Sequence, residues 1–182
     1  MKKTKISSQE ARDTQDNDHF WERKKLSQMT PEEWESLCDN CGRCCLNKIE
    51  YEDTQEIFYT NVSCHLLNRN TCKCKDYQNR KMIVPDCLQL SPRNIKKLSY
   101  MPDTCAYRLV AEGKELPQWH PLISKSKSTV HSSGISVRNK VISEKQMDRD
   151  LEDYIIDWVK PSKGQYARKQ KQKKSAKKNL DS

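Results

Sequence analysis

Four cysteines fall within eight residues of this sequence, in the run Cys38-Asp-Asn-Cys41-Gly-Arg-Cys44-Cys45. A thiolate is the soft ligand that zinc ions and iron–sulfur clusters take from proteins. Two cysteines three residues apart can face one metal from a tight turn, and Gly42 lets the backbone wrap further so that Cys44 can join them. The run therefore predicts a cysteine-ligated metal site.

Cys45 follows Cys44 directly, and because the two cysteines are adjacent they are limited in how they can bind metal. Neighbouring side chains point to opposite faces of a strand and about 100° apart on a helix, so they seldom ligate one ion together. The pair could serve two centres or bridge a polynuclear one. The nine cysteines stand at positions 38, 41, 44, 45, 64, 72, 74, 87 and 105. They can supply two four-ligand sites with one to spare, or one cluster of shared thiolates.

The spacing leaves the metal open between zinc and an iron–sulfur cluster. Three cysteines at intervals of three are typical of the start of a [4Fe–4S] site, but Cys45 follows at once and no proline comes next. A zinc ribbon needs a second Cys-x-x-Cys pair, and the later part of the chain offers Cys72-Lys-Cys74 instead. Buried reduced cysteines or a redox pair are weaker interpretations, because packing does not need four cysteines in eight residues.

The composition indicates a fold that does not depend on a large apolar core. Of the 182 residues, 34% are hydrophobic and 32% are charged, which is low for a core that spans the whole chain. We find neither an apolar leader nor a run of about 20 apolar residues that could cross a bilayer. We therefore expect a cytoplasmic protein with no membrane partner, whose thiols stay reduced and can bind metal.

The positive charge is concentrated at the C-terminal end of the chain. Residues 160–182 contain nine Lys or Arg and one Asp, so they carry +8 of the net charge of +9. Such a tail could contact nucleic-acid backbones without sequence preference. Tyr166 is its one aromatic residue, which leaves little capacity to stack on bases. A solubilising tail is the preferred interpretation.

The chain divides into three expected segments. Residues 1–18 are predicted to be a disordered N-terminus, residues 19–160 a cysteine-cluster metal-binding domain, and residues 161–182 a disordered basic tail. The domain is predicted to be small, irregular and α+β, with short helices and a β-hairpin around the cysteine cluster. Metal ligands would then stabilise it in place of a large core.

Local signals place the elements that must position the cysteines. Thr30 and Glu33 form a capping-box pattern, so a short helix should carry Trp34 and Leu37 inward and end at Cys38. Alternating apolar residues predict a hairpin over 46–62. Further helices are expected near 77–82, 91–98 and 103–111, a strand over 135–138, and an amphipathic helix over 144–159.

Other polar side chains receive mainly structural interpretations. His65 could be a ligand beside Cys64, but a solvent-facing neighbour is the preferred interpretation. His120 is expected to pack or hydrogen-bond in its aromatic loop, rather than to transfer protons. Arg80 and Arg108 lie near cysteines in the sequence and could stabilise thiolate charge. A Gly-rich phosphate loop, a Ser–His–Asp arrangement and a dinucleotide fingerprint are all missing from the sequence, so it favours no particular enzyme class.

The cysteine region resembles a known family. From Phe20 to Glu144 the chain is similar to the YcgN-like cysteine-cluster family, within a wider class named for its CxxCxxCC motif and described as chelating zinc or iron. The similarity includes Phe20-Trp21, Trp34-Glu-Ser-Leu-Cys-Asp39, Cys41-Gly-x-Cys-Cys-Leu46, Thr71-Cys-x-Cys74, Pro85-Asp-Cys87, Thr104-Cys-Ala-Tyr-Arg-Leu109 and Trp119-His-Pro-Leu122. Asn40 stands where the motif usually has Gly, and Asn tolerates a left-handed turn.

The resemblance implies a set of metal ligands. These are Cys38, Cys41, Cys44, Cys45, Cys64, Cys74, Cys87 and Cys105. Cys72 would be the extra cysteine. Flagellin lysine methylases of the wider class are described with an iron–sulfur cluster, but this chain covers only their cysteine-cluster part, so their activity does not transfer.

Three functions remain in view from the sequence. The first is a metal-stabilised binding or adaptor module with structural zinc or an iron–sulfur cluster. The second is an iron–sulfur protein with redox or enzymatic duties. The third is a nucleic-acid-associated zinc protein that uses its basic tail. The first is preferred, because ligands that hold the fold would account for the low apolar content.

Overall fold

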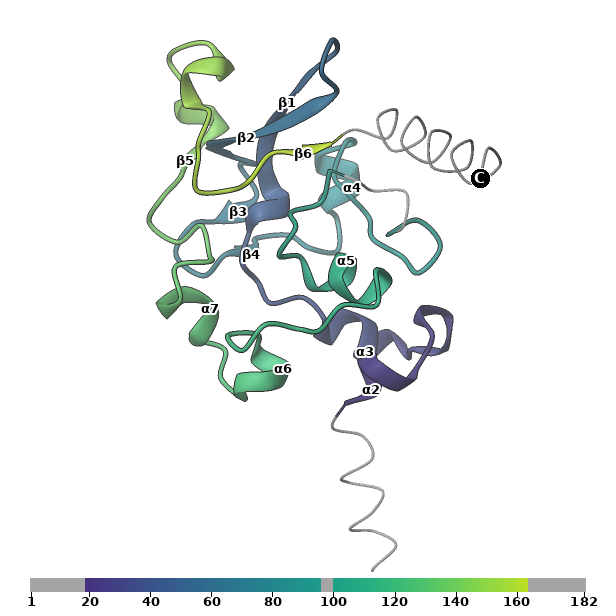
Figure 1. The fold of residues 1–182 in the computed structure, drawn as a ribbon. Helices are drawn as coiled ribbons and strands as arrows, with labels where there is room; N and C mark the ends of the chain where they lie inside the picture. Colours follow the sequence, from purple (N-terminus) through teal and green to yellow (C-terminus); the bar gives the residue numbers. More distant parts are fainter. Residues whose placement is uncertain (1–18, 96–99, 164–182) are drawn as a thin grey trace, which may run out of the picture.

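The computed structural model describes residues 19–95 and 100–163, which form a small mixed α+β fold (Figure 1). Several of the short helices gather at one end of the molecule, and the four-stranded sheet lies toward the other. The helices are α2 (Phe20–Arg23), η1 (Leu26–Gln28), α3 (Pro31–Ser36), η2 (Arg43–Cys45), α4 (Arg80–Ile83), α5 (Ala106–Ala111), α6 (Pro121–Ser124), α7 (Thr129–Ser132), η4 (Glu144–Gln146) and η5 (Leu151–Tyr154). The predictions for residues 1–18 and 164–182 lie outside the described residues.

The sheet is built around one long strand, β2 (Glu56–Ser63). β1 (Leu46–Tyr51) runs antiparallel to it, from the pair Tyr51–Glu56 to the pair Leu46–Ser63, which confirms the predicted hairpin. Two distant strands complete the sheet. β5 (Ile142–Ser143) pairs parallel with the end of β2, and β6 (Ser162–Lys163) pairs antiparallel with its start. The described fold thus continues to Lys163, past the predicted domain boundary at residue 160.

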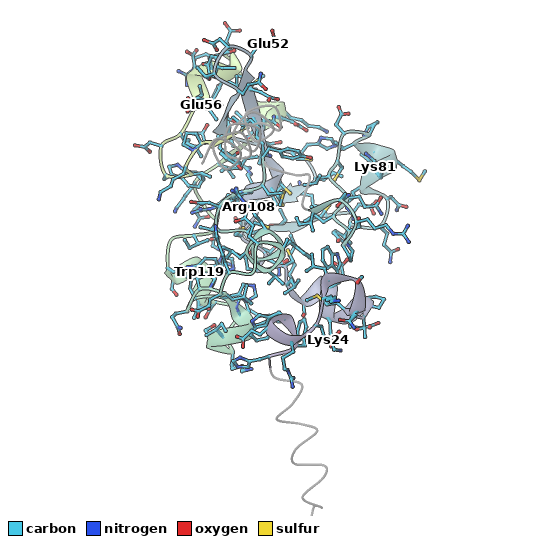
Figure 2. The ribbon with its side chains drawn as sticks, turned by 45° about the vertical axis from the view of Figure 1, so that its right-hand side comes forward. Lys24, Glu52, Glu56, Lys81, Arg108 and Trp119 are labelled. Carbon is cyan, nitrogen blue, oxygen red and sulfur yellow. The ribbon has the colours of Figure 1, made fainter. Side chains whose placement is uncertain are left out.

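The hairpin turn carries the acidic residues of this region into solvent. Figure 2 places Glu52 at the outer tip of the hairpin, away from the body of the molecule. Glu50, Glu52 and Asp53 are exposed. A second, two-stranded sheet pairs β3 (Leu67–Asn68) with β4 (Lys73–Cys74). It brings a later cysteine back beside the end of β2.

The helix α3 begins at the predicted capping box. The Glu33 N–H donates to Thr30 Oγ1 (3.2 Å) and the Thr30 N–H donates to the Glu33 carboxylate (2.9 Å). The helix buries Trp34, and Leu37 at its C-cap is fully buried. Lys24 adds an ion pair to Glu33 at 2.6 Å. The position of Cys38, one residue past the C-cap, is therefore set by the local sequence.

We expect Thr30→Ala to lower the free energy of unfolding by about 1 kcal/mol, because the Glu33 N–H loses its acceptor at the helix start. Thr30→Ser keeps the hydroxyl and should recover most of the loss. Urea denaturation of the three proteins measures both changes. Equal stability of the alanine and serine variants would contradict the capping role.

The buried apolar residues form two separate clusters. The first lies among the helices and includes Trp21, Trp34, Leu37, Met101 and Tyr107. The second lies against the sheet and consists of Leu46, Tyr59, Leu67, Cys72, Val137, Val141 and Val159. Cysteines take part in both clusters, since Cys105 belongs to the first and Cys72 to the second.

Two predicted elements are wrong. Residues 135–138 form a loop, not a strand, and the Val137 N–H donates instead to the Cys41 carbonyl (2.9 Å). Residues 144–159 contain two short 3-10 turns in place of the amphipathic helix. Pairing with β2 overrides the helical periodicity there: Ile155 forms a bridge with Thr60, and the Ile156 N–H donates to the Tyr59 carbonyl.

The remaining helices are shorter than predicted. The helix expected over 103–111 is α5, which starts at Ala106 and is followed by Gly113 in a left-handed conformation. The helix expected near 77–82 is α4, which starts at Arg80. Residues 92–94 of the segment predicted as helix over 91–98 form a turn, and residues 96–99 lie outside the described residues.

Candidate metal centre

A cavity of about 500 Å³ lies between the two apolar clusters. Trp34, Leu37 and Tyr107 of the first cluster line it, as do Leu46 and Leu67 of the second. Eight cysteines also line this cavity: Cys38, Cys41, Cys44, Cys45, Cys64, Cys74, Cys87 and Cys105. These are the eight residues of the predicted ligand set, drawn from segments up to 67 positions apart (105 − 38).

The ninth cysteine is placed differently. Cys72 is not among the lining residues and is buried in the cluster under the sheet. No cysteine is in a disulfide among the described residues, which include all nine. The structure thus separates one packed cysteine from eight that face a shared space.

Five of the eight lining cysteines lie at or just beyond the end of a short element. Cys38 follows α3, Cys64 follows β2, and Cys105 is the N-cap of α5. Cys74 closes β4. Cys87 follows α4, and its N–H donates to the Val84 carbonyl (2.9 Å). The ends of five different elements therefore meet at the cavity.

The loop from Cys38 to Cys45 wraps around one side of the cavity. The Cys41 N–H donates to Asp39 Oδ1 (2.9 Å), and Asn40 adopts a left-handed conformation with φ of 56°. Gly42 follows with φ of 77° and begins the single 3-10 turn that carries Cys44 and Cys45. The predicted wrap at Gly42 is confirmed, and Asn40 supplies a second left-handed residue.

Charge is distributed unevenly over the adjacent pair of thiols. The Sγ atoms of Cys44 and Cys45 lie 4.0 Å apart. A hydrogen bond from Cys45 and the nearby ammonium of Lys48 lower the pKa of Cys44 to about 7, against the effect of burial. The same hydrogen bond raises the pKa of Cys45. The hydrogen bond between the two thiols therefore favours ionisation of one of them over ionisation of both.

The other thiols of this loop are held in their neutral form. Burial, followed by the charge of nearby acids and thiols, raises the pKa of Cys38 and of Cys41. Burial also raises the pKa of Cys105 to about 12. A cation placed among these groups would reverse that shift, because metal coordination deprotonates a thiol.

The donor set fits a thiophilic metal. Asp39 is buried, and its Oδ2 lacks a hydrogen-bond partner among the described residues. A buried carboxylate oxygen without a partner costs free energy unless positive charge lies nearby. Sulfur donors select zinc or iron–sulfur clusters over calcium or magnesium. Within the described chain no three cysteine sulfurs lie within 4.8 Å of one another, so binding would draw the side chains inward.

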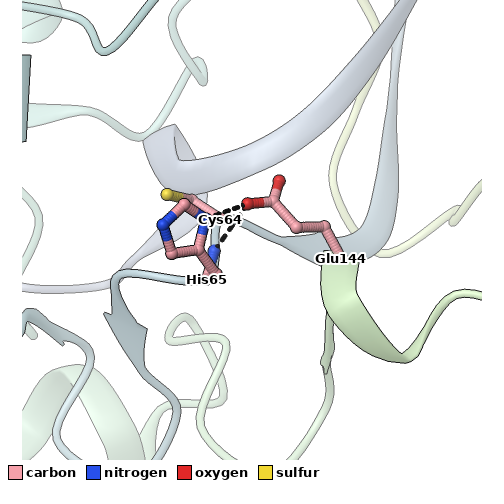
Figure 3. A group of neighbouring side chains, drawn as sticks. All are labelled: Cys64, His65 and Glu144. Carbon is pink, nitrogen blue, oxygen red and sulfur yellow. Dashed lines mark hydrogen bonds and ion pairs between the residues drawn. The ribbon is translucent and has the colours of Figure 1, made fainter. Parts of the chain in front are cut away.

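One compact group of possible ligands does occur in the described residues, at Cys64, His65 and Glu144. The Glu144 carboxylate accepts from the His65 N–H (2.9 Å) and contacts His65 Nδ1 (2.5 Å). Figure 3 shows the carboxylate turned toward His65, with the Cys64 sulfur on the far side of the ring in this view. His65 is thus half-buried and paired, rather than the solvent-facing neighbour that was predicted.

Glu144 orients the segment that carries Cys64. Although burial opposes ionisation, the hydrogen bonds from His65 lower the pKa of the Glu144 carboxyl group. These two contacts tie the turn at Glu144 to the residue that follows Cys64. The sequence reasoning missed this residue, because nothing local connects position 144 with position 65.

The two arginines differ in their relation to the cavity. Arg80 lines the cavity, stacks over the Tyr77 ring at 3.7 Å, and acts against the burial that raises the pKa of Cys87. Arg108 instead pairs with Glu112 at 2.9 Å and donates to the Met101 carbonyl at 2.7 Å. Arg80 therefore contributes positive charge near a candidate ligand, while Arg108 ties α5 to the preceding loop.

His120 is fully buried beside the start of the cysteine loop. Its Nδ1 accepts from the Leu122 N–H and its Nε2 faces the Leu37 carbonyl, both at 3.2 Å. Both contacts are satisfied by a neutral ring with its proton on Nε2. This arrangement agrees with the packing role predicted for His120. Its contact with the Leu37 carbonyl anchors the residue that precedes Cys38.

We expect His120 to make the protein less stable in mild acid. Burial lowers the pKa of His120 below its usual 6.5, so the unfolded chain binds a proton that the folded chain does not. The free energy of unfolding should therefore fall as pH drops below 6.5, until the folded-state pKa is passed. Denaturant unfolding from pH 7 to pH 5 should show a smaller decline in His120→Gln. Identical declines would contradict this role, since His131, whose pKa is also lowered, is present in both proteins.

No helix of the described chain is long and apolar enough to cross a membrane.

Comparison with known proteins places the chain in a family. Residues 37–106 match the CxxCxxCC family model, described as "Putative zinc- or iron-chelating domain". A UPF0260 protein of Rhizobium leguminosarum bv. trifolii is 54% identical over 140 residues, which cover 76% of this chain and 88% of that relative. A UPF0260 protein of Brucella melitensis is 54% identical over 144 residues, covering 79% of this chain and 95% of that relative. No solved structure matches. The cysteine pattern and these relatives show that the chain belongs to the UPF0260 family.

Proposed function

We propose that this protein is a cytoplasmic metal-binding protein in which zinc or an iron–sulfur cluster is ligated by cysteines and holds the fold together. One observation carries the proposal: eight of nine cysteines line a single cavity between two separate apolar clusters. A metal in that cavity would join the helical half of the molecule to the sheet. The chelating domain described for residues 37–106 supports the same function.

A structural role is favoured over catalysis by the surroundings of the cavity. Its walls are mainly apolar side chains and cysteines, and the polar residues Asp39, Lys48 and Glu144 that also line it are hydrogen-bonded to neighbouring backbone groups. A catalytic metal site needs an open coordination position. Eight thiols are instead enough to saturate four-coordinate centres. The non-specific nucleic-acid contact of the basic tail stays a prediction.

The test is to purify the protein without oxygen, record its visible spectrum, and measure zinc, iron and sulfide per chain. Colourless protein with stoichiometric zinc supports structural zinc, and brown protein with matching iron and sulfide supports a cluster. Metal-free protein from every preparation, with all nine thiols reactive, would refute the proposal. Cys72→Ala is the matched control, because Cys72 lies outside the cavity lining and its loss should leave the metal content unchanged.

A further inference from the structure

The eight cavity cysteines fall into two groups of four according to their neighbours. This division deepens the proposed function and rests on it. It is carried by the hydrogen bonds and packing contacts that fix the segments around the cavity. The two groups meet at the adjacent residues Cys44 and Cys45.

The first group joins the cysteine loop to the start of α5. Arg43, between Cys41 and Cys44, is buried and donates to Thr104 Oγ1 (3.2 Å) and to the Ile135 carbonyl (2.7 Å). Its bond to Thr104 brings the next residue, Cys105, beside the loop.

The packing of α3 against α5 sets the rest of this group. The rings of Trp34 in α3 and Tyr107 in α5 lie 4.6 Å apart. Cys38 follows α3 and Cys105 is the N-cap of α5, so this packing brings both cysteines to one side of the cavity. The other two cysteines of the group, Cys41 and Cys44, stand on the loop that continues from Cys38 around the same side.

The second group joins the end of the same loop to the sheet. The Cys64 N–H donates to the Cys45 carbonyl (3.0 Å), so these two residues lie side by side at the end of β2. Cys74 pairs with Leu67 in the small sheet, and the next residue, Lys75, donates to the Leu66 carbonyl (2.8 Å). These bonds return Cys74 to the turn that begins at Cys64.

Cys87 completes the second group. Tyr77, Arg80 and Val84 also line the cavity, so the segment from Cys74 to Cys87 follows the cavity wall. The Cys87 N–H donates to the Val84 carbonyl (2.9 Å), which fixes Cys87 at the end of this segment. Cys45 also packs against the cluster under the sheet, which turns it away from the helical half of the molecule.

We propose that the chain holds two adjacent four-thiolate metal centres, one ligated by Cys38, Cys41, Cys44 and Cys105 and the other by Cys45, Cys64, Cys74 and Cys87. Four thiolates complete a structural zinc site, and four also hold one [4Fe–4S] cluster. The two centres stand next to each other, because the sulfurs of Cys44 and Cys45 are 4.0 Å apart. Neighbouring cysteines in the chain thus bind different centres, which avoids directing adjacent side chains to one ion.

The first measurement uses the unaltered chain. The reduced, metal-free protein is titrated with Co²⁺ and then with Zn²⁺ under anaerobic conditions, and the anaerobically purified protein is analysed for iron and sulfide. Two centres predict two equivalents of Co²⁺ or Zn²⁺ with tetrahedral four-thiolate absorption for cobalt, or about eight iron atoms in two clusters. One equivalent, three or more equivalents, or a single cluster per chain would overturn the division.

The second measurement assigns the ligands. Cys105→Ser and Cys87→Ser should each lose half of the bound metal, and the two changes together should lose all of it. Cys38→Ser combined with Cys105→Ser should lose no more than Cys105→Ser alone, because both residues serve the same centre. The grouping is contradicted if a double variant within one group loses all of its metal while circular dichroism shows that it stays folded. If the variants fail to fold, the titration of the unaltered chain decides whether there are two centres. If the unaltered chain binds no metal at all, the proposed function itself is refuted.

Discussion

Removing the metal proposed for this site with a chelator is expected to abolish the cooperative thermal unfolding of this protein. Only 34% of the residues are hydrophobic, which leaves a small core for each of the two apolar clusters. We therefore expect the clusters to supply only part of the free energy of unfolding. A structural zinc site contributes about 10–16 kcal/mol of apparent binding free energy. The total stability of a small domain is about 5–15 kcal/mol, so loss of the metal should remove most of it.

The measurement is circular dichroism during heating, with and without chelator. Chelator already saturated with zinc is the control, because it adds the same solute without removing metal. Returning Zn²⁺, or iron and sulfide, to the stripped protein should restore the transition. An unchanged melting temperature in protein shown to be metal-free would mean that the clusters are sufficient and that the metal is not structural.

The second large effect is expected from Gly42→Ala. A Cβ at this position would lie 2.7 Å from Val137 Cγ2, and φ is 77°, a conformation that side chains rarely adopt. The left-handed backbone costs roughly 1–2 kcal/mol and overpacking a buried site costs roughly 1–3 kcal/mol more. We expect the variant to be less stable by about 2–5 kcal/mol and to bind metal less tightly, since Gly42 shapes the turn between Cys41 and Cys44.

Gly113→Ala is the matched control for this effect. Gly113 is also left-handed, with φ of 67°, but nothing lies within 4 Å of a Cβ added there. It should therefore show the backbone cost alone and keep its metal. Adding Val137→Ala to Gly42→Ala removes the clashing methyl group, so the double variant should be more stable than the sum of the two single changes predicts. Equal losses at Gly42 and Gly113 would show that the contact with Val137 carries no cost.

Local chemistry made the start of the site predictable. The capping pair Thr30 and Glu33 fixes where α3 begins, and the composition of the run after it fixes a turn at Gly42. The hairpin likewise follows from alternation between neighbours in sequence. The capping box joins residues three positions apart, and the hairpin joins two strands that follow one another directly in the sequence. The sequence could therefore indicate the wrap of the cysteine loop before its surroundings were known.

Contacts between distant segments decided the rest. The periodicity over 144–159 is helical, yet the bridge between Thr60 and Ile155 holds that segment along β2. The loop at Val137 is set by its bond to Cys41, almost a hundred positions earlier. Spacing alone also could not separate Cys72 from the other cysteines. Its side chain is directed into the cluster under the sheet by packing that no short motif encodes.

The pairing of β2 has a consequence for how the protein is made. Its hairpin partner β1 is synthesised just before it, but β5 and β6 end only at Ser143 and Lys163. A ribosome therefore synthesises every cysteine, the last at position 105, before the strands that finish the sheet. Glu144, which also lines the cavity, follows β5 directly. The wall of the cavity is therefore completed only after all eight of its thiols have been synthesised.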